Sequence, residues 1–245
     1  MNSLLRAASL PTTLTSLALA GAISLGLTAC ASARPAGPVH VMGQEGAIAR
    51  ARADSLRYPY TPADIDFMKG MIHHHAQAIT MSRLVPARRA SPSIQRLSER
   101  IINAQSDEIT LMQNWLKDRN QQAPLVDSTG AVSMGNAAGH AAHGMPGHDM
   151  ASMPGGTMMP GMLTDAQMKE LATANGAEFD RLFLTYMIQH HRGAVGMVKK
   201  LFSSRGAGQD ETVFKFANDV EVDQSTEIRR MLSMMLEMGF PLPPG

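Results

Sequence analysis

The chain has 245 residues, 44% of them hydrophobic and 18% charged, a composition typical of a protein with an ordinary folded core. Its formal net charge is +1, which gives no electrostatic basis for binding nucleic acid. Methionine is the anomaly, because the 20 Met outnumber the 7 Phe, 3 Tyr and 1 Trp together. Such a bias indicates a use for thioether sulfur or for flexible apolar side chains.

Residues 1–29 predict a signal peptide, because Arg6 precedes an apolar run too short for a comfortable membrane span. The run ends in Leu-Thr-Ala-Cys, which resembles a bacterial lipobox and predicts cleavage before Cys30 with lipidation of its thiol. The alternative is ordinary cleavage after Ala33, which would remove the cysteine. We favour the lipoprotein, whose only link to the membrane is this anchor. With either cleavage, the mature protein is exported and has no disulfide.

The first folded unit is predicted at residues 58–120, after a tether with a weak helical pattern at residues 30–57. Thr61 is a suitable N-cap, and Asp64 completes a capping box with it. We predict a helix from this cap and, after a second N-cap at Ser91, another helix with apolar residues at helical spacing. Together they form an antiparallel hairpin.

Residues 164–240 repeat this plan. The pair Thr164 and Gln167 predicts the capping box of a short helix, which is followed by long helices at about 177–204 and 210–238. The last helix contains DQSTEIRRML, which echoes AQSDEITLMQ in the first hairpin. Both members of the hairpin are therefore duplicated, and the predicted fold is an all-α four-helix bundle.

Residues 121–163 predict a flexible linker rich in Gly, Met and His. One interpretation is a plain connector. A solvated connector, however, has no physical need for so many thioether and imidazole groups, which suit Cu(I) or Ag(I). We therefore favour metal capture by the linker residues His140, His143, Met145, His148, Met150, Met153, Met158, Met159 and Met162.

One line of sequence occurs twice, as FMKGMIHHHAQAITM (residues 67–81) and FLTYMIQHHRGAVGM (residues 183–197). At about 100° per residue, the repeated His and Met positions share the buried side of each helix, whereas His73 and its counterpart Gln189 point away. Buried imidazoles cost free energy unless each finds a partner, either a metal ion or a carboxylate. The candidate metal ligands are Met71, His74, His75, Met81, Met187, His190, His191, Met197, Asp64 and Asp180.

Four polar residues on the other two long helices lie along otherwise apolar stripes, where hydrogen bonds from them would fix the histidine tautomers. These residues are Gln105, Glu108, Gln224 and Glu227. A structural polar network without metal remains the alternative to metal ligation.

The lines YTPADIDFMKGMIHHHAQAITM, IINAQSDEITLMQNWL and GMLTDAQMKELATANGAEFDRLFLTYMIQHHRGAVGM resemble the bacterial family known as domain of unknown function 305, a ferritin-like four-helix arrangement. The resemblance covers about residues 60–116 and 160–238. Some members are similar to periplasmic copper-binding proteins that contribute to copper tolerance. The resemblance thus implies copper binding by Met71, His74, His75, Met187, His190 and His191.

We therefore expect a periplasmic protein, lipid-anchored at Cys30, that sequesters Cu(I) or Cu(II), and silver as a second soft ion, or hands the ion to a partner protein. We expect a binding protein and not an enzyme. Two alternatives are a helical interaction module with an adaptable methionine surface and a ferritin-like di-metal oxidase. The oxidase requires Glu-x-x-His motifs, and the chain contains none.

The anchor can be tested by replacing Cys30 with Ser. We expect Cys30→Ser to release the protein from the membrane fraction or to block its processing, because the lipidated thiol is lost. Fractionation followed by immunoblotting measures both. Unchanged fractionation and processing would remove the case for a lipoprotein.

Overall fold

The computed structural model describes residues 43–49, 59–134 and 158–244. The predicted signal peptide, Cys30 and the middle of the predicted linker lie outside these ranges. Residues 43–49 form a helix within the stretch that has a weak helical pattern. Across the described ranges, no helix combines the length and apolar character needed to cross a membrane.

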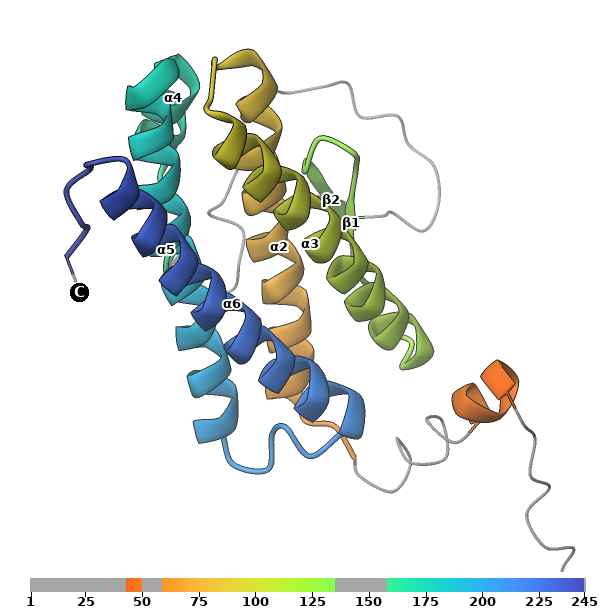
Figure 1. Ribbon diagram of the computed structural model, residues 1–245. Helices are drawn as coiled ribbons and strands as arrows, with labels where there is room; N and C mark the ends of the chain where they lie inside the picture. Colours follow the sequence, from red (N-terminus) through yellow and green to blue (C-terminus); the bar gives the residue numbers. More distant parts are fainter. Residues whose placement is uncertain (1–42, 50–58, 135–157, 245) are drawn as a thin grey trace, which may run out of the picture. The chain divides into compact units, whose positions relative to one another are not determined.

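The first hairpin consists of α2 (Pro62–Leu84) and α3 (Pro92–Asp118), joined by a 3-10 turn. The predicted capping box is present, since Thr61 Oγ1 accepts from the backbone N–H of Asp64 at 3.3 Å and Thr61 N–H donates to the Asp64 carboxylate at 2.7 Å. The two helices lie side by side in Figure 1.

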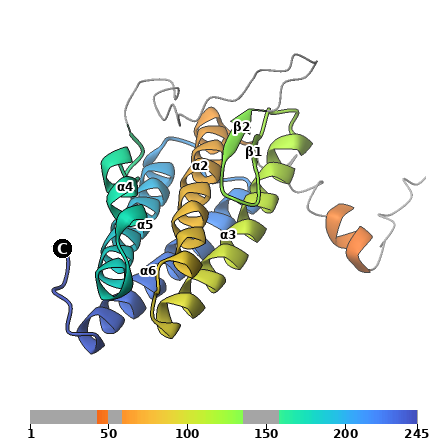
Figure 2. The ribbon, with the colours of Figure 1, turned by 90° about the horizontal axis from the view of Figure 1, so that it is seen from above.

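The second hairpin consists of α5 (Gly176–Ser203) and α6 (Glu211–Glu237), preceded by the short helix α4 (Asp165–Thr173). The predicted capping box of α4 is also present. The N-cap of α6 is Asp210, whose side chain accepts from two backbone N–H groups of the first turn. The predicted all-α fold built from two hairpins is therefore confirmed (Figures 1 and 2).

Helices α2 and α5 pack against each other and join the two hairpins. They run in opposite directions through two apolar clusters. Helix α2 packs in the first cluster up to Ile72 and in the second from Ala78 and Met81, although Ile79 still packs in the first. Helix α5 passes from the second cluster at Ile188 to the first at Ala194. The histidine pair of each helix therefore lies where the helix changes from one cluster to the other.

The predicted linker is partly structured at its beginning, which corrects the expectation of a flexible segment over residues 121–163. Strands β1 (Pro124–Val126) and β2 (Val132–Met134) form an antiparallel pair beside α2 and α3 (Figure 2). The turn between them is held by Asp127, whose carboxylate accepts from the backbone N–H groups of Thr129 and Ala131 at 2.8 and 3.0 Å. These local hydrogen bonds replace the water contacts of a free loop.

The end of the predicted linker is structured as well. Met162 and Leu163 are buried, with 2% of each side chain exposed. Their apolar side chains are covered by the bundle, so this end belongs to the core rather than to a solvated linker.

A buried ion pair ties the start of α6 to the end of α3. The Asp210 carboxylate, which is fully buried, accepts from Trp115 Nε1 at 3.0 Å and from the Arg119 guanidinium. The exposed pair of Arg181 and Glu178 on α5 offers a comparison.

We expect Asp210→Asn to lower the free energy of unfolding by about 3 kcal/mol, because it leaves the Arg119 charge buried without a counter-charge. Urea unfolding followed by circular dichroism measures this change. The control Glu178→Gln breaks an exposed pair and should have little effect. Equal effects of the two substitutions would contradict the structural role of Asp210.

Candidate metal centre

A polar layer crosses the bundle between the two apolar clusters, and all four long helices contribute to it. We call it the histidine layer; it consists of His74, His75, Gln105, Glu108, His190, His191, Gln224 and Glu227. Its four histidines have no exposed surface, so the predicted buried side of α2 and α5 is confirmed. The two glutamates are partly exposed, at 20% for Glu108 and 17% for Glu227.

The second histidine of each pair, His75 or His191, makes the same contact in both halves, and we call these two the outer histidines. His75 Nε2 lies 2.6 Å from a Glu108 carboxylate oxygen, and His191 Nε2 lies 2.7 Å from one of Glu227. An ionised carboxylate only accepts hydrogen bonds, so each Nε2 donates. In the neutral ring, Nδ1 then carries the lone pair. This is the arrangement in which a carboxylate orients a metal-binding imidazole.

The first histidine of each pair, His74 or His190, is called an inner histidine. The two inner histidines meet at the seam, the contact between α2 and α5. The rings of His74 and His190 lie with their centroids 3.8 Å apart and their planes at 38°. His74 Nε2 is 3.1 Å from the backbone carbonyl oxygen of Pro160, which can only accept, so Nε2 is the donor. Among the described residues, neither ring nitrogen of His190 makes a hydrogen bond of good geometry, although the backbone of His74 lies close enough to raise the pKa of His190 slightly against the effect of burial.

Burial sets the charge of these two inner rings. It lowers the pKa of His74 to about 3, with a further contribution from the neighbouring His75. Burial also lowers the pKa of His190 well below its usual value, and His74 lowers it further. Both imidazoles are thus neutral at pH 7, and each retains a lone pair.

Several buried polar atoms of the histidine layer have no partner among the described residues. They are Nδ1 of His74, His75, His190 and His191, Nε2 of His190, both amide atoms of Gln105 and the amide oxygen of Gln224. A buried polar atom without a partner costs about 1–3 kcal/mol, and such atoms are rare in folded proteins. Their concentration in one layer therefore indicates that the layer accommodates something polar or cationic.

Thioether sulfur adjoins the histidines on both sides of the layer. Met71 precedes His74 by one helical turn and packs in the first apolar cluster, whereas Met187 precedes His190 by one turn and packs in the second. Both methionines are fully buried, as is Met81, and Met197 is 9% exposed. Within the described ranges, no three His, Cys, Asp or Glu side chains are grouped as a metal-ligand set.

The predicted ligands Asp64 and Asp180 serve elsewhere. Asp64 caps α2 and accepts from the backbone N–H of Gly208 at 2.7 Å, and Asp180 accepts from the backbone N–H of Ser91 at 3.1 Å. Asp64 precedes His74 by ten residues on one helix, which is about 15 Å of helix length. The expectation that these carboxylates partner the histidines is corrected, since they hold loops at the helix ends.

The predicted capture residues divide into two groups. His140, His143, Met145, His148, Met150 and Met153 lie outside the described residues. At the other end, Met158 is exposed, Met159 is partly buried and Met162 is buried in the core. Met162 is therefore not available to a capture segment.

His73 and Gln189, predicted to point away from the interior, are both half-buried, and burial lowers the pKa of His73.

The Pro160 carbonyl was not predicted as a histidine partner. A backbone oxygen leaves no signature in the pattern of side chains, so the sequence could not have revealed it.

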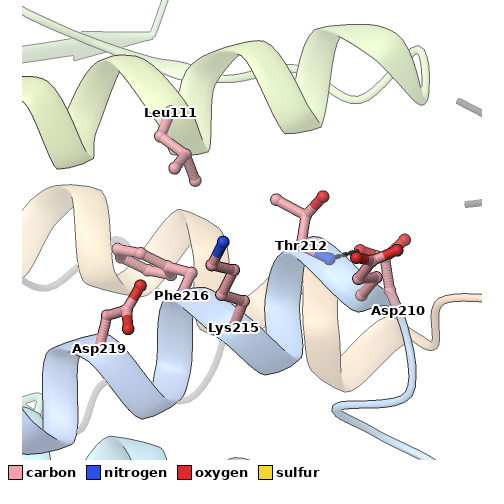
Figure 3. Close-up of a pocket in the computed structure, with 7 residues that line it drawn as sticks. Leu111, Asp210, Thr212, Lys215, Phe216 and Asp219 are labelled. Atoms are coloured by element: carbon pink, nitrogen blue, oxygen red, sulfur yellow. Dashed lines mark hydrogen bonds between the residues drawn. The ribbon is translucent and has the colours of Figure 1, made fainter. Parts of the chain in front are cut away.

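A separate surface hollow lies between α3 and the start of α6 (Figure 3). Leu111 faces it from α3, and Lys215 and Phe216 face it from α6. Its lining contains neither His nor Met, and its buried carboxylate, Asp210, is already paired. The hollow is thus unrelated to the histidine layer.

The fold and the site define an all-α bundle of two duplicated hairpins with a buried histidine layer. The chain belongs to the DUF305 family, since the model of that family, described as a domain of unknown function, matches residues 64–235.

Solved structures of the same family are similar to this chain. A DUF305 protein from Streptomyces coelicolor, proposed to be secreted, is 28% identical over 75% of this chain and 98% of its own, with a TM-score of 0.55. A DUF305 fragment from Deinococcus radiodurans is 26% identical over 73% and 99%, with a TM-score of 0.54.

Two other matches are more limited. CopM in the Cu(I)-bound form is 24% identical over 73% of this chain and 98% of its own, with a TM-score of 0.49. Uncharacterized protein L153 of Acanthamoeba polyphaga mimivirus is 41% identical over 59 residues, 24% of this chain. The chain spans 39% of the length of that curated relative.

The lowered histidine pKa values predict that the metal-free protein loses stability on acidification. The folded-state pKa values of His74 and His190 lie below the ordinary 6.5, so the unfolded chain binds protons first as the pH falls. The loss begins near pH 7 and continues down to about 3, the folded-state pKa of His74. Each histidine contributes at most about 1.4 kcal/mol per pH unit.

Urea unfolding of the metal-free protein between about pH 7 and about pH 5 measures this slope. His190→Gln keeps a polar side chain but removes one titrating group, so its slope should be shallower by about one proton. A free energy of unfolding that does not change with pH would contradict the neutral, buried state of these rings.

Proposed function

We propose that this protein binds copper ions in the histidine layer and that it sequesters them or hands them to a partner protein. The observation that carries the proposal is the set of buried imidazole nitrogens without partners. Two of these rings are oriented by carboxylates at the opposite nitrogen, and buried thioethers lie one helical turn away. A metal ion would take up the free lone pairs and relieve the cost of burying them.

The donor set favours soft ions. Thioether sulfur is a good ligand for Cu(I) and a poor one for hard cations, and imidazole suits copper in both oxidation states. Silver, as Ag(I), would be accepted for the same reason. Mg(II) and Mn(II) prefer oxygen ligands, so the layer should discriminate against them.

The proposal is of a binding protein and not of an enzyme. A di-metal oxidase would use its glutamates as ligands, whereas Glu108 and Glu227 are hydrogen-bonded to histidines here. An interaction module without metal would leave the unpartnered nitrogens unexplained.

We further propose that the protein works outside the cytoplasm. The predicted signal peptide supports export, and the similar Streptomyces protein is itself proposed to be secreted. Lipidation at Cys30 would keep the bundle at the membrane, and contributing to metal tolerance is the role we infer for it there. Residues 135–157 would add a weaker capture segment of Met and His.

The test is a Cu(I) competition titration with a chelator of known affinity, on a variant in which a Gly/Ser spacer replaces residues 135–157. The deletion stops there because Met162 and Leu163 belong to the core. We expect His75→Ala and His191→Ala each to weaken Cu(I) binding by loss of a nitrogen ligand. The matched control His73→Ala, on the same helix turn, should be close to neutral.

Glu108→Gln should have a smaller effect, a weakening of about 10- to 100-fold at most, because it changes only the orientation of His75. Circular dichroism establishes that each variant keeps its helices. Equal losses for His73→Ala and His191→Ala would show that the site is not in the layer. Failure of the parent protein to bind Cu(I) would leave the layer as a structural polar network.

A further inference from the structure

Residues 159–163 form a short strap that lies directly on α5. At Gly193 there is no space for a side chain, because an added Cβ would lie 2.0 Å from the carbonyl oxygen of Pro160 and 2.6 Å from Cα of Gly161. Gly161 has φ of +77°, and a Cβ there would lie 2.6 Å from the backbone oxygen of Gln189. Two glycines therefore allow backbone to pack on backbone at this point.

Hydrogen bonds fasten the same strap to both central helices. Gln77 on α2 holds Leu163 at both backbone groups, accepting from its N–H at 2.7 Å and donating to its carbonyl at 3.0 Å. Gln189 on α5 donates to the carbonyl of Gly161 at 3.4 Å. The strap thus spans the seam between α2 and α5, at the level of the histidine layer.

The strap supplies the partner of one inner histidine. Its Pro160 carbonyl accepts from His74 Nε2, which leaves the lone pair of His74 on the buried Nδ1. Glu108 and Glu227 do the same for His75 and His191. His190, the duplicate of His74, has no such partner at either nitrogen within the part of the chain that the structure describes.

We propose that the strap positions His74, and that Gly193 is the residue that makes this possible. The strap fixes His74 as the Nε2–H tautomer with Nδ1 free for an ion, and it makes the two halves of the layer unequal. The expected effect on Cu(I) affinity rests on the proposed copper function. The positioning of His74 by the strap does not depend on that function. The strap is the last part of the segment that connects the two hairpins. The end of this connection therefore supplies a histidine partner to the candidate site.

The test compares Gly193→Ala with Gly196→Ala, one turn further along α5. An added Cβ at Gly196 meets nothing within 4 Å, so the control adds the same methyl group without displacing the strap. Histidine ¹H–¹⁵N spectra of the metal-free, full-length protein report the tautomer of each ring. The signals of His74 are identified by their absence in His74→Gln.

We expect His74 to be the Nε2–H tautomer in the parent protein and in Gly196→Ala, and to become a mixture of tautomers in Gly193→Ala. Cu(I) affinity, measured by competition, should fall about 10- to 100-fold in Gly193→Ala alone, the usual effect of losing a partner that orients a ligand. Gln77→Leu, which frees the strap without adding bulk to α5, should change the spectrum in the same direction and serves if Gly193→Ala does not fold.

An unchanged His74 tautomer in both folded strap variants would overturn the proposal. A parent protein that binds no Cu(I) would instead refute the proposed function, while the spectra of the metal-free protein would still decide whether the strap positions His74. The two failures are therefore distinguishable.

Discussion

The burial of four imidazole rings in a layer between two apolar clusters is the constraint on which the rest of this structure depends. Burial keeps the inner rings of His74 and His190 neutral, and a neutral ring has one donor and one acceptor to satisfy. The protein provides acceptors for the Nε2–H of three rings, from Glu108, Glu227 and the Pro160 carbonyl. Among the described residues no group partners the Nδ1 atoms, so the layer is polar and rich in lone pairs.

Duplication of the hairpin explains much of this arrangement. The contact between His75 and Glu108 in the first half reappears between His191 and Glu227 in the second, with nearly equal distances of 2.6 and 2.7 Å. Because α2 and α5 run in opposite directions, each half places its methionine in a different apolar cluster. Thioethers therefore flank the layer from both sides, where an unbranched, polarizable side chain can serve as packing or as ligand.

The equivalence of the halves ends at the seam. The segment that joins the hairpins occurs once, so the strap it forms can serve only one of the two inner histidines. His74 has the Pro160 carbonyl, whereas the ring of His190 lies at a tilt against that of His74 and its nitrogens have no hydrogen-bond partner among the described residues. A bundle built by duplication thus acquires an asymmetric centre from its connection.

The sequence by itself determined the long helices, the capping boxes of α2 and α4 and the buried side of α2 and α5, because capping and helical phase depend on residues a few positions apart. It also predicted that polar residues of α3 and α6 would hydrogen-bond the histidines, although not which residue would meet which histidine. Only the tertiary structure decided that Glu108 meets His75, 33 residues away, and that Asp64 serves a loop instead. The contact between the strap and Gly193 could likewise not be predicted from the sequence, because a backbone contact between distant segments has no side-chain pattern. Those pairings depend on how the helices pack, which local spacing does not specify.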